Sequence, residues 1–303
     1  MNTRSQKKSL PSFVKTYHHK PYAAISPSRP ELSAKDKIVL ITGAGSGVGE
    51  ATVHAFAEAG AKAIILCGRR VDPLNKVKAD VESKFPHTEA AVYSLDVSNE
   101  GSVGYVFKDV KATYGPLDIV VNSAGHLSDK GSIAESSLSN FWDSFEITVK
   151  GAFLIAQHFL HNRSDSSRDP VFISFNSLLA PMPASTVRAP ASYASSKMAQ
   201  GKMIEYVAKE NVGQIRAYNV HPGIIVTEMS TKSVNMAPDP DAARKGNTWD
   251  DGKSERNSEA GRKSRADVAQ STFQAISAFG SLRKKGMRFP LDGTYGRTGM
   301  LKS

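Results

Sequence analysis

The stretch PASYASSK, residues 190–197, places a tyrosine and a lysine four positions apart. Positions i and i+4 of a helix share one face, so a helix here would make the Tyr193 phenol and the Lys197 ammonium neighbours. A cation about 4 Å from a phenol favours the phenolate by roughly 4 kcal/mol at an effective dielectric near 20. The pair therefore predicts either a tyrosine that exchanges protons or an ordinary solvated helix face.

A glycine-rich turn follows the first apolar run, KIVLIT, and leads directly into a helical pattern. Gly43, Gly47 and Gly49 permit a tight turn, close approach of the backbone to a pyrophosphate, and close packing of the helix on a sheet. A turn in this place predicts a dinucleotide site. A purely structural glycine turn is the alternative.

Two arginines end the second apolar run, where a dinucleotide fold reads the adenosine ribose. An acidic residue there would bind a free 2′-hydroxyl, whereas Arg69 and Arg70 suit a 2′-phosphate. The sequence therefore favours NADP over NAD, with two exposed loop arginines as the alternative. Asp96 follows the third run and could accept from the adenine amino group or form a turn.

Six short runs rich in β-branched residues alternate with longer helical patterns. These runs occupy residues 37–42, 62–67, 90–95, 117–122, 170–175 and 215–220. Strands separated by helices predict a doubly wound parallel sheet in a single Rossmann-like α/β domain. In such a sheet, ligands gather beyond the carboxyl ends of the strands, where all of these motifs fall.

The organisation expected along the chain has four parts. A basic arm (1–34) precedes the dinucleotide-binding and catalytic domain (35–229), which is followed by a polar insertion or substrate lid (230–265) and a C-terminal helix with an edge strand (266–303). The insertion is rich in Lys, Arg, Asp, Ser and Asn and poor in large apolar residues, which is typical of a loose segment.

Composition narrows the partners and the compartment. The chain of 303 residues has a net charge of +10 that lies in its two ends, without a recognisable nucleic-acid-reading module. Its apolar runs are far shorter than the roughly 20 residues of a membrane helix, and its histidines lack metal-ligand spacing. We expect no nucleic acid, membrane or metal partner. A single cysteine, Cys67, fits the cytoplasm, although the basic start leaves organelle targeting open.

Ordered motifs along the chain identify a family resemblance. They are TGAGSGVG, DV at Asp96, NSAG at Asn122, NS at Ser177, YASSK and HPGIIVT. From about residue 37 to residue 229 the chain resembles the classical short-chain dehydrogenases/reductases, and fungal members most closely. The resemblance implies one doubly wound domain that binds NAD(P) and moves a hydride between C4 of nicotinamide and a carbonyl or alcohol carbon.

The resemblance also implies residue roles. In reduction, Tyr193 would protonate the nascent alkoxide, Ser177 would hydrogen-bond the same oxygen, and Lys197 would lower the pKa of Tyr193 and bind the nicotinamide ribose. Val48 would offer backbone to the phosphates, Asn122 would lie beside the adenosine ribose, and the loop after the sixth strand would touch the carboxamide. The full expected cofactor set is Gly43, Ser46, Gly47, Val48, Gly49, Arg69, Arg70, Asp96, Asn122, Lys150, Tyr193, Lys197, Ile225 and Thr227.

Three features depart from the family pattern. Thr148 stands where the family usually has an asparagine that positions a water leading from the lysine, which predicts a slowed proton relay. Ser177 precedes Tyr193 by sixteen positions, about three more than usual, which predicts a bulged loop at the substrate entrance. Ser174 is the weaker candidate for the serine role because strand alternation would aim it elsewhere. The chain after Met229 is unlike the usual substrate lid.

The sequence thus predicts an NADP-dependent oxidoreductase that reduces a ketone or aldehyde, or runs in reverse on a secondary alcohol. A small organic substrate from fungal secondary metabolism is expected by association with the resembling proteins. The alternative is a non-catalytic NADP-binding sensor or assembly protein. The family commonly forms dimers or tetramers, so a homodimer or homotetramer is also expected.

Overall fold

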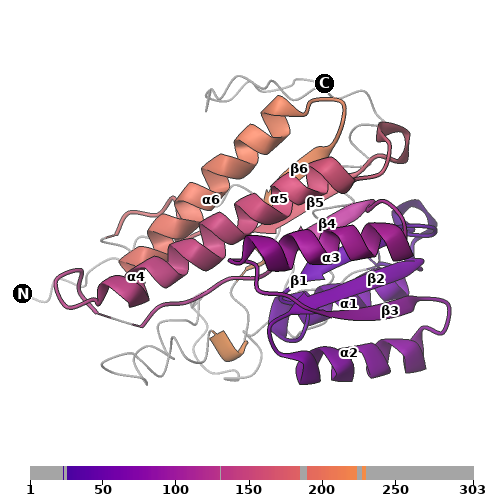
Figure 1. The fold of residues 1–303 in the computed structure, drawn as a ribbon, viewed down its shortest axis with the longest axis horizontal. Coiled ribbons are helices and arrows are strands. Elements are labelled where there is room, and N and C mark those ends of the chain that lie inside the picture. The colour runs from indigo at the N-terminus through magenta and orange to yellow at the C-terminus, as the bar shows by residue number, and fades with distance from the viewer. Residues whose placement is uncertain (1–22, 24–25, 130, 185–189, 224–226, 230–303) are drawn as a thin grey trace, which may run out of the picture.

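One six-stranded parallel sheet forms the centre of the computed structural model, which describes residues 23, 26–129, 131–184, 190–223 and 227–229 (Figure 1). The strands are β1 (Ile38–Thr42), β2 (Ala63–Gly68), β3 (Glu89–Ser94), β4 (Ile119–Asn122), β5 (Val171–Phe175) and β6 (Arg216–Val220). Their order is β3-β2-β1-β4-β5-β6, and every pair is parallel. The predicted doubly wound α/β fold is confirmed.

Helices cover both faces of the sheet (Figure 1). The two on one face are α1 (Gly47–Glu58) and α2 (Val71–Lys84), and the three on the other are α3 (Glu100–Thr113), α5 (Gly151–Asn162) and α6 (Ala191–Glu210). Successive strand residues supply the two cores alternately: Val39 and Ile41 pack beneath α1 and α2, whereas Leu40 joins the core of Phe107 and Phe159. Burial on both faces explains why these strands read as continuous apolar runs.

A buried carboxylate, that of Asp118, joins several chain segments at the amino ends of the strands. Asp118 exposes none of its side chain and accepts hydrogen bonds from Arg168 Nε at 2.7 Å, Arg168 Nη2 at 2.8 Å and the Ile38 backbone N–H at 2.9 Å. Burial alone would raise the pKa of Asp118, but these bonds and the nearby Lys37 charge hold that pKa below its ordinary value. Arg168 comes from a short 3-10 turn, η4 (Ser166–Arg168), just before β5.

A π-helical turn interrupts one long helix. The helix α4 (Leu138–Phe145) continues through η3 (Glu146–Lys150) into α5, so the three run as one rod in Figure 1. A π turn holds one residue more than an α turn and is frequent at functional sites. Thr148 lies at its middle, fully buried, so the helix is distorted here without the family's usual asparagine.

Several sequence predictions lie outside the described residues. These include residues 1–22 of the basic arm, the insertion 230–265, the C-terminal part 266–303 and Ile225. A further short 3-10 turn, η2 (Pro30–Leu32), precedes β1. Within the described parts of the chain, no helix combines the length and apolar content needed to cross a membrane.

Candidate active site

The candidate site lies beyond the carboxyl ends of the strands, where the strand order reverses between β1 and β4. Thr42, the last residue of β1, ties these two strands together. Its hydroxyl donates to Asn122 Oδ1 at 3.1 Å and accepts from the backbone N–H groups of Ser123 and Ala124, both at 3.0 Å. Sequence reasoning missed Thr42, because a threonine at a strand end gives no signal of its own.

The glycine turn is as tight as the sequence predicted. Gly43 has a φ of +66°, and a Cβ on Gly49 would stand 2.1 Å from the Gly43 carbonyl oxygen, so position 49 admits no side chain. Ser46 is the N-cap of α1 but makes no side-chain cap bond there. The first N–H groups of α1, including that of Val48, therefore face outward at the positive end of the helix dipole, which suits an anion.

The chain that follows β6 returns to this turn. The Thr227 methyl group would stand 3.0 Å from a Cβ on Gly47, which itself has a φ of +58°. The fold thus brings Thr227 to the glycine turn from a distant part of the sequence.

Charges of both signs lie near the carboxyl ends of β2 and β3. Arg70 forms an ion pair with Glu228 at 3.5 Å, with both side chains exposed. Hydrogen bonds from Ser98 are the main cause of a lowered Asp96 pKa, and the charges of Arg69 and Lys150 add to it. Lys150 also pairs with Glu146 at 2.9 Å. Arg69, Arg70 and Asp96 thus gather at neighbouring strand ends as expected.

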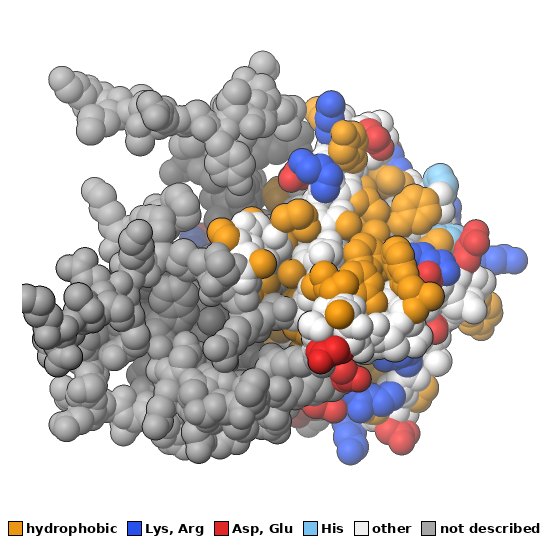
Figure 2. Space-filling model, turned by 90° about the vertical axis from the view of Figure 1, so that its left-hand side faces the viewer, with side chains coloured by type: hydrophobic (Ala, Val, Ile, Leu, Met, Phe, Trp, Pro, Cys, Tyr) orange, Lys and Arg blue, Asp and Glu red, His pale blue; other side chains and the backbone are white. Residues whose placement is uncertain are grey.

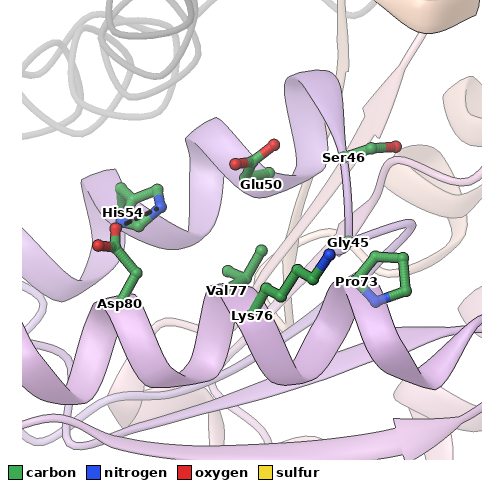
Figure 3. Close-up of a pocket in the computed structure, with 8 residues that line it drawn as sticks. All are labelled: Gly45, Ser46, Glu50, His54, Pro73, Lys76, Val77 and Asp80. Carbon is green, nitrogen blue, oxygen red and sulfur yellow. Dashed lines mark ion pairs between the residues drawn. The ribbon is translucent and has the colours of Figure 1, made fainter.

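A polar groove runs between α1 and α2 behind the glycine turn (Figure 3). Glu50 and His54 from α1 face Lys76 and Asp80 from α2, and Lys76 points toward Gly45. The groove includes Gly45 and Ser46 of the glycine turn, but neither Tyr193 nor Lys197 lines it. Lys76 is a positive charge near the turn that sequence reasoning did not identify.

The serine and the tyrosine meet despite their unusual spacing. Ser177 follows β5 directly, Tyr193 lies in the first turn of α6, and their side chains are hydrogen-bonded. The Ser177 backbone N–H donates to Asn176 Oδ1 at 2.7 Å, and its hydroxyl accepts from the Leu179 N–H at 3.2 Å. Asn176 therefore helps to hold the serine, a role that sequence reasoning missed.

The acidity of Tyr193 differs from the expectation. Burial raises the pKa of Tyr193 above its ordinary value, and the hydrogen bond from Ser177 offsets only part of this effect. The expectation that Lys197 lowers this pKa is not met in the protein without cofactor, because desolvation of the phenol outweighs any favourable term. The phenol is therefore protonated at neutral pH.

The lysine lies one turn further along α6 and is almost fully buried. Its Nζ donates to the Phe175 carbonyl oxygen at 2.7 Å and to Gln200 Oε1 at 3.0 Å, and a Cβ on Gly125 would stand 3.7 Å from it. Burial lowers the pKa of Lys197 to about 8. The i, i+4 arrangement on one helix is as predicted, but the contact with Gln200 was not foreseen.

Three further polar side chains are buried near these elements. Thr148 Oγ1, on the π turn that packs against α6, has no hydrogen-bond partner among the described residues. Asn122 is engaged within the sheet, by Thr42 and, at 3.4 Å, by the Ser174 hydroxyl. Its contact with a ribose stays a prediction. Ser174 is buried inside β5, the structural role that the sequence favoured for it.

Comparison with known proteins places this arrangement in a family. The model of the short chain dehydrogenases matches residues 37–238. A short chain dehydrogenase of Emericella variicolor, andI, is 29% identical over 72% of this chain and 74% of its own length. Another from Monascus ruber, pigC, is 32% identical over 71% of this chain and 70% of its own length.

Solved structures agree with the fold. L-sorbose reductase from Gluconobacter frateurii, complexed with NADPH and L-sorbose, is 25% identical, with a TM-score of 0.66 over 80% of this chain and 91% of that one. An alcohol dehydrogenase from Thermococcus sibiricus, complexed with 5-hydroxy-NADP, has a TM-score of 0.64 at 22% identity, covering 88% of this chain and 100% of that one. From the family model and the relatives together, this chain belongs to the short chain dehydrogenase family of oxidoreductases.

Proposed function

We propose that this protein is an NADP(H)-dependent oxidoreductase that reduces a ketone or aldehyde of a small organic substrate, or oxidises the matching alcohol. The observation that carries the proposal is the hydrogen-bonded Ser177–Tyr193 pair, one helical turn from a buried lysine. These are the residue types that bind and protonate a carbonyl oxygen.

The residues fit a nicotinamide dinucleotide. The uncapped N-terminus of α1, with Ser46, Gly47 and Val48, would hold the pyrophosphate, and the glycine at position 49 lets this helix pack closely on the turn. Arg69 and Arg70 would hold a 2′-phosphate, which supports NADP over NAD. The NADP(H) complexes of L-sorbose reductase and of the Thermococcus sibiricus enzyme are in keeping with this choice. When bound, the nicotinamide supplies or accepts the hydride.

The protein's own part in reduction is to bind an oxygen and protonate it. The Ser177 hydroxyl donates to the substrate oxygen, and the Tyr193 phenol gives its proton to that oxygen as negative charge develops there. Lys197 adds a positive charge that favours the phenolate left behind. Burial raises the pKa of Tyr193 in the cofactor-free protein, so the resting phenol carries the proton that reduction requires.

The test is turnover of NADPH and NADH with a panel of ketones and aldehydes, for the parent protein and for Tyr193→Phe. We expect NADPH-dependent reduction of at least one compound and a loss of 100-fold or more in the variant, about the contribution of a general acid. Equal rates for parent and variant on every compound would overturn the assignment. The family comparison gives the non-catalytic alternative no support.

We also propose that the protein self-associates as a homodimer or homotetramer. Figure 2 shows apolar side chains gathered on one face of the molecule. Large apolar residues exposed on α4, α5 and α6 are Leu138, Trp142, Phe153, Met198 and Tyr206. Large apolar side chains exposed on neighbouring helices are in keeping with a protein interface. Light scattering of the purified protein tests this, and a monomer at micromolar concentration would contradict it.

A cytoplasmic location and a substrate from fungal secondary metabolism remain proposals of the same kind. Cys67 is fully buried, and burial raises the pKa of its thiol, which supports a packing role compatible with a reducing compartment. The fungal origin of the relatives supports the substrate class. Imaging of a fluorescent fusion, and assay of carbonyl compounds from fungal secondary metabolism within the panel, test these two points.

A further inference from the structure

Gln200 is a neutral polar residue in a place where an apolar one would be expected. It lies on α6, it is fully buried, and Ile204 one turn later belongs to the apolar core. Its Oε1 accepts the hydrogen bond from Lys197 Nζ at 3.0 Å. The amide is thus directed at the lysine from within its own helix.

The other half of the amide gains nothing from this position. Gln200 Nε2 has no hydrogen-bond partner among the residues that the structure describes. A buried donor without a partner is destabilising, and an apolar side chain of similar size would avoid that penalty. Stability therefore gives no reason for glutamine at position 200, whereas its contact with Lys197 does.

The surroundings of Lys197 show what a glutamine can do there. None of the ion pairs in the described part of the chain includes Lys197, and its two acceptors are the neutral oxygens of Phe175 and Gln200. On α6 itself, Tyr193 lies one turn before Lys197, and Lys202 pairs with Glu205 beyond it. On the π turn, Glu146 and Lys150 pair with each other. A carboxylate at position 200 would orient the ammonium but cancel its charge, whereas an amide orients it and leaves the charge intact.

We propose that Gln200 is a positioning residue that fixes the Lys197 ammonium, one helical turn along α6 from Tyr193, without neutralising it. The inference rests on the proposed function, because it gives the lysine charge a use in proton transfer from the phenol. It also assigns a role to a residue that makes no contact with substrate.

The experiment compares Gln200→Met, which keeps the size and removes the amide, with Gln200→Glu, which keeps the acceptor and adds a charge. The control is Ile204→Met, at a buried position on the same helix one turn further from Lys197. Three quantities are measured: the Lys197 titration by NMR of cofactor-free, 13C-lysine-labelled protein, the melting temperature, and kcat and KM for carbonyl reduction. Lys197→Met serves to assign the lysine resonance.

For Gln200→Met we expect kcat to fall about tenfold or more with KM within about twofold, because a hydrogen bond to a charged group is lost. We expect its Lys197 to titrate at lower pH. Its melting temperature should stay close to that of the parent, because loss of the hydrogen bond to the ammonium offsets removal of the unpaired amide donor. In Gln200→Glu, Lys197 titrates at higher pH, and kcat also falls because the charge is cancelled. Ile204→Met should leave kcat and the Lys197 titration unchanged.

Parental kcat and a parental Lys197 titration in Gln200→Met would overturn the inference, and so would a loss of activity that merely follows a lower melting temperature in both variants. Such results leave the proposed function intact if Tyr193→Phe still loses turnover. If the parent shows no turnover that depends on Tyr193, the proposed function fails instead. The NMR titration of the cofactor-free protein still decides whether Gln200 controls Lys197.

Discussion

One charged side chain is buried at the amino ends of the strands and another near their carboxyl ends, and the two have opposite kinds of surroundings. At the amino ends, Asp118 receives three hydrogen bonds, two of them from the Arg168 guanidinium. Near the carboxyl ends of the strands, the acceptors of the Lys197 ammonium among the described residues are the neutral oxygens of Phe175 and Gln200. The comparison indicates that a charge which holds the fold is matched by an opposite charge, while a charge kept for chemistry is left unmatched at some expense of stability.

The largest expected effect is at the unmatched charge. Lys197→Met should lower kcat/KM for reduction at least about 100-fold, because the charge that favours the phenolate is gone. The same change should raise the free energy of unfolding at pH 7 by about 1–3 kcal/mol, since burial lowers the pKa of Lys197 to about 8. Assay and urea denaturation measure the two effects, and a clear loss of stability would break the comparison.

Removal of the Arg168 charge, which pairs with Asp118, should instead destabilise the fold. Arg168→Met should lower the free energy of unfolding by about 2–3 kcal/mol, because it leaves Asp118 buried without its counter-charge while Arg168 itself is partly exposed. The folded fraction should keep parental KM values. Lys78→Met, in an exposed pair with Glu82, is the matched control, with an expected change below about 0.5 kcal/mol.

Both charges predict that stability rises with pH, but in different pH windows. The folded-state pKa of Asp118 is lowered, so its contribution is present above the unfolded pKa near 3.9 and is lost as the pH falls further. Lys197 has a lowered pKa as well, but it is a base, so its penalty applies at neutral pH and is relieved as the pH rises from about 8 toward 10.5. Denaturation curves of Arg168→Met and Lys197→Met across pH should each lose one of these slopes.

A smaller effect, on cofactor affinity, is expected from changes at Arg69 and Glu228. Arg69→Gln should weaken NADPH binding about tenfold and leave NADH nearly unchanged, because only the 2′-phosphate needs the guanidinium. Glu228→Gln should strengthen NADPH binding about twofold, since it releases Arg70 from an exposed ion pair. Titration calorimetry measures both, and equal losses for NADPH and NADH would contradict the assignment to NADP.

The smallest expected effect is at the π turn. Thr148 has a buried hydroxyl without a partner in the described structure, and an amide there would offer both a donor and an acceptor. Thr148→Asn should therefore raise turnover by about two- to fivefold if proton relay is slow. Unchanged turnover across pH would show that the threonine does not limit the reaction.

Strands and motifs could be predicted because their signals are local. Buried parallel strands form continuous apolar runs, and the six predicted strands match the observed ones to within two residues. The largest difference is at β4, which begins at Ile119, two residues later than predicted. The glycine turn and the Tyr193–Lys197 spacing likewise need only neighbouring residues.

The missed parts of the site depend on which way a side chain faces. Gln200 and Asn176 are polar residues that would be read as exposed, yet they contact Lys197 and Ser177. The pKa of Tyr193 was predicted from the lysine charge alone, but the burial that dominates it arises only from tertiary packing. The approach of Thr227 to the glycine turn joins residues far apart in the chain.

The π turn at residues 146–150 also fixes a rotation. Each residue advances a helix by roughly 100°, so the extra residue turns α4 by about that angle relative to a continuous α-helix. Deleting one residue from this turn would rotate α4 about its axis, so that the exposed Trp142 points in a different direction. The buried residues of α5 would keep their packing against the sheet. A single-codon deletion could thus redirect the outward aromatic face of the molecule with its core left in register.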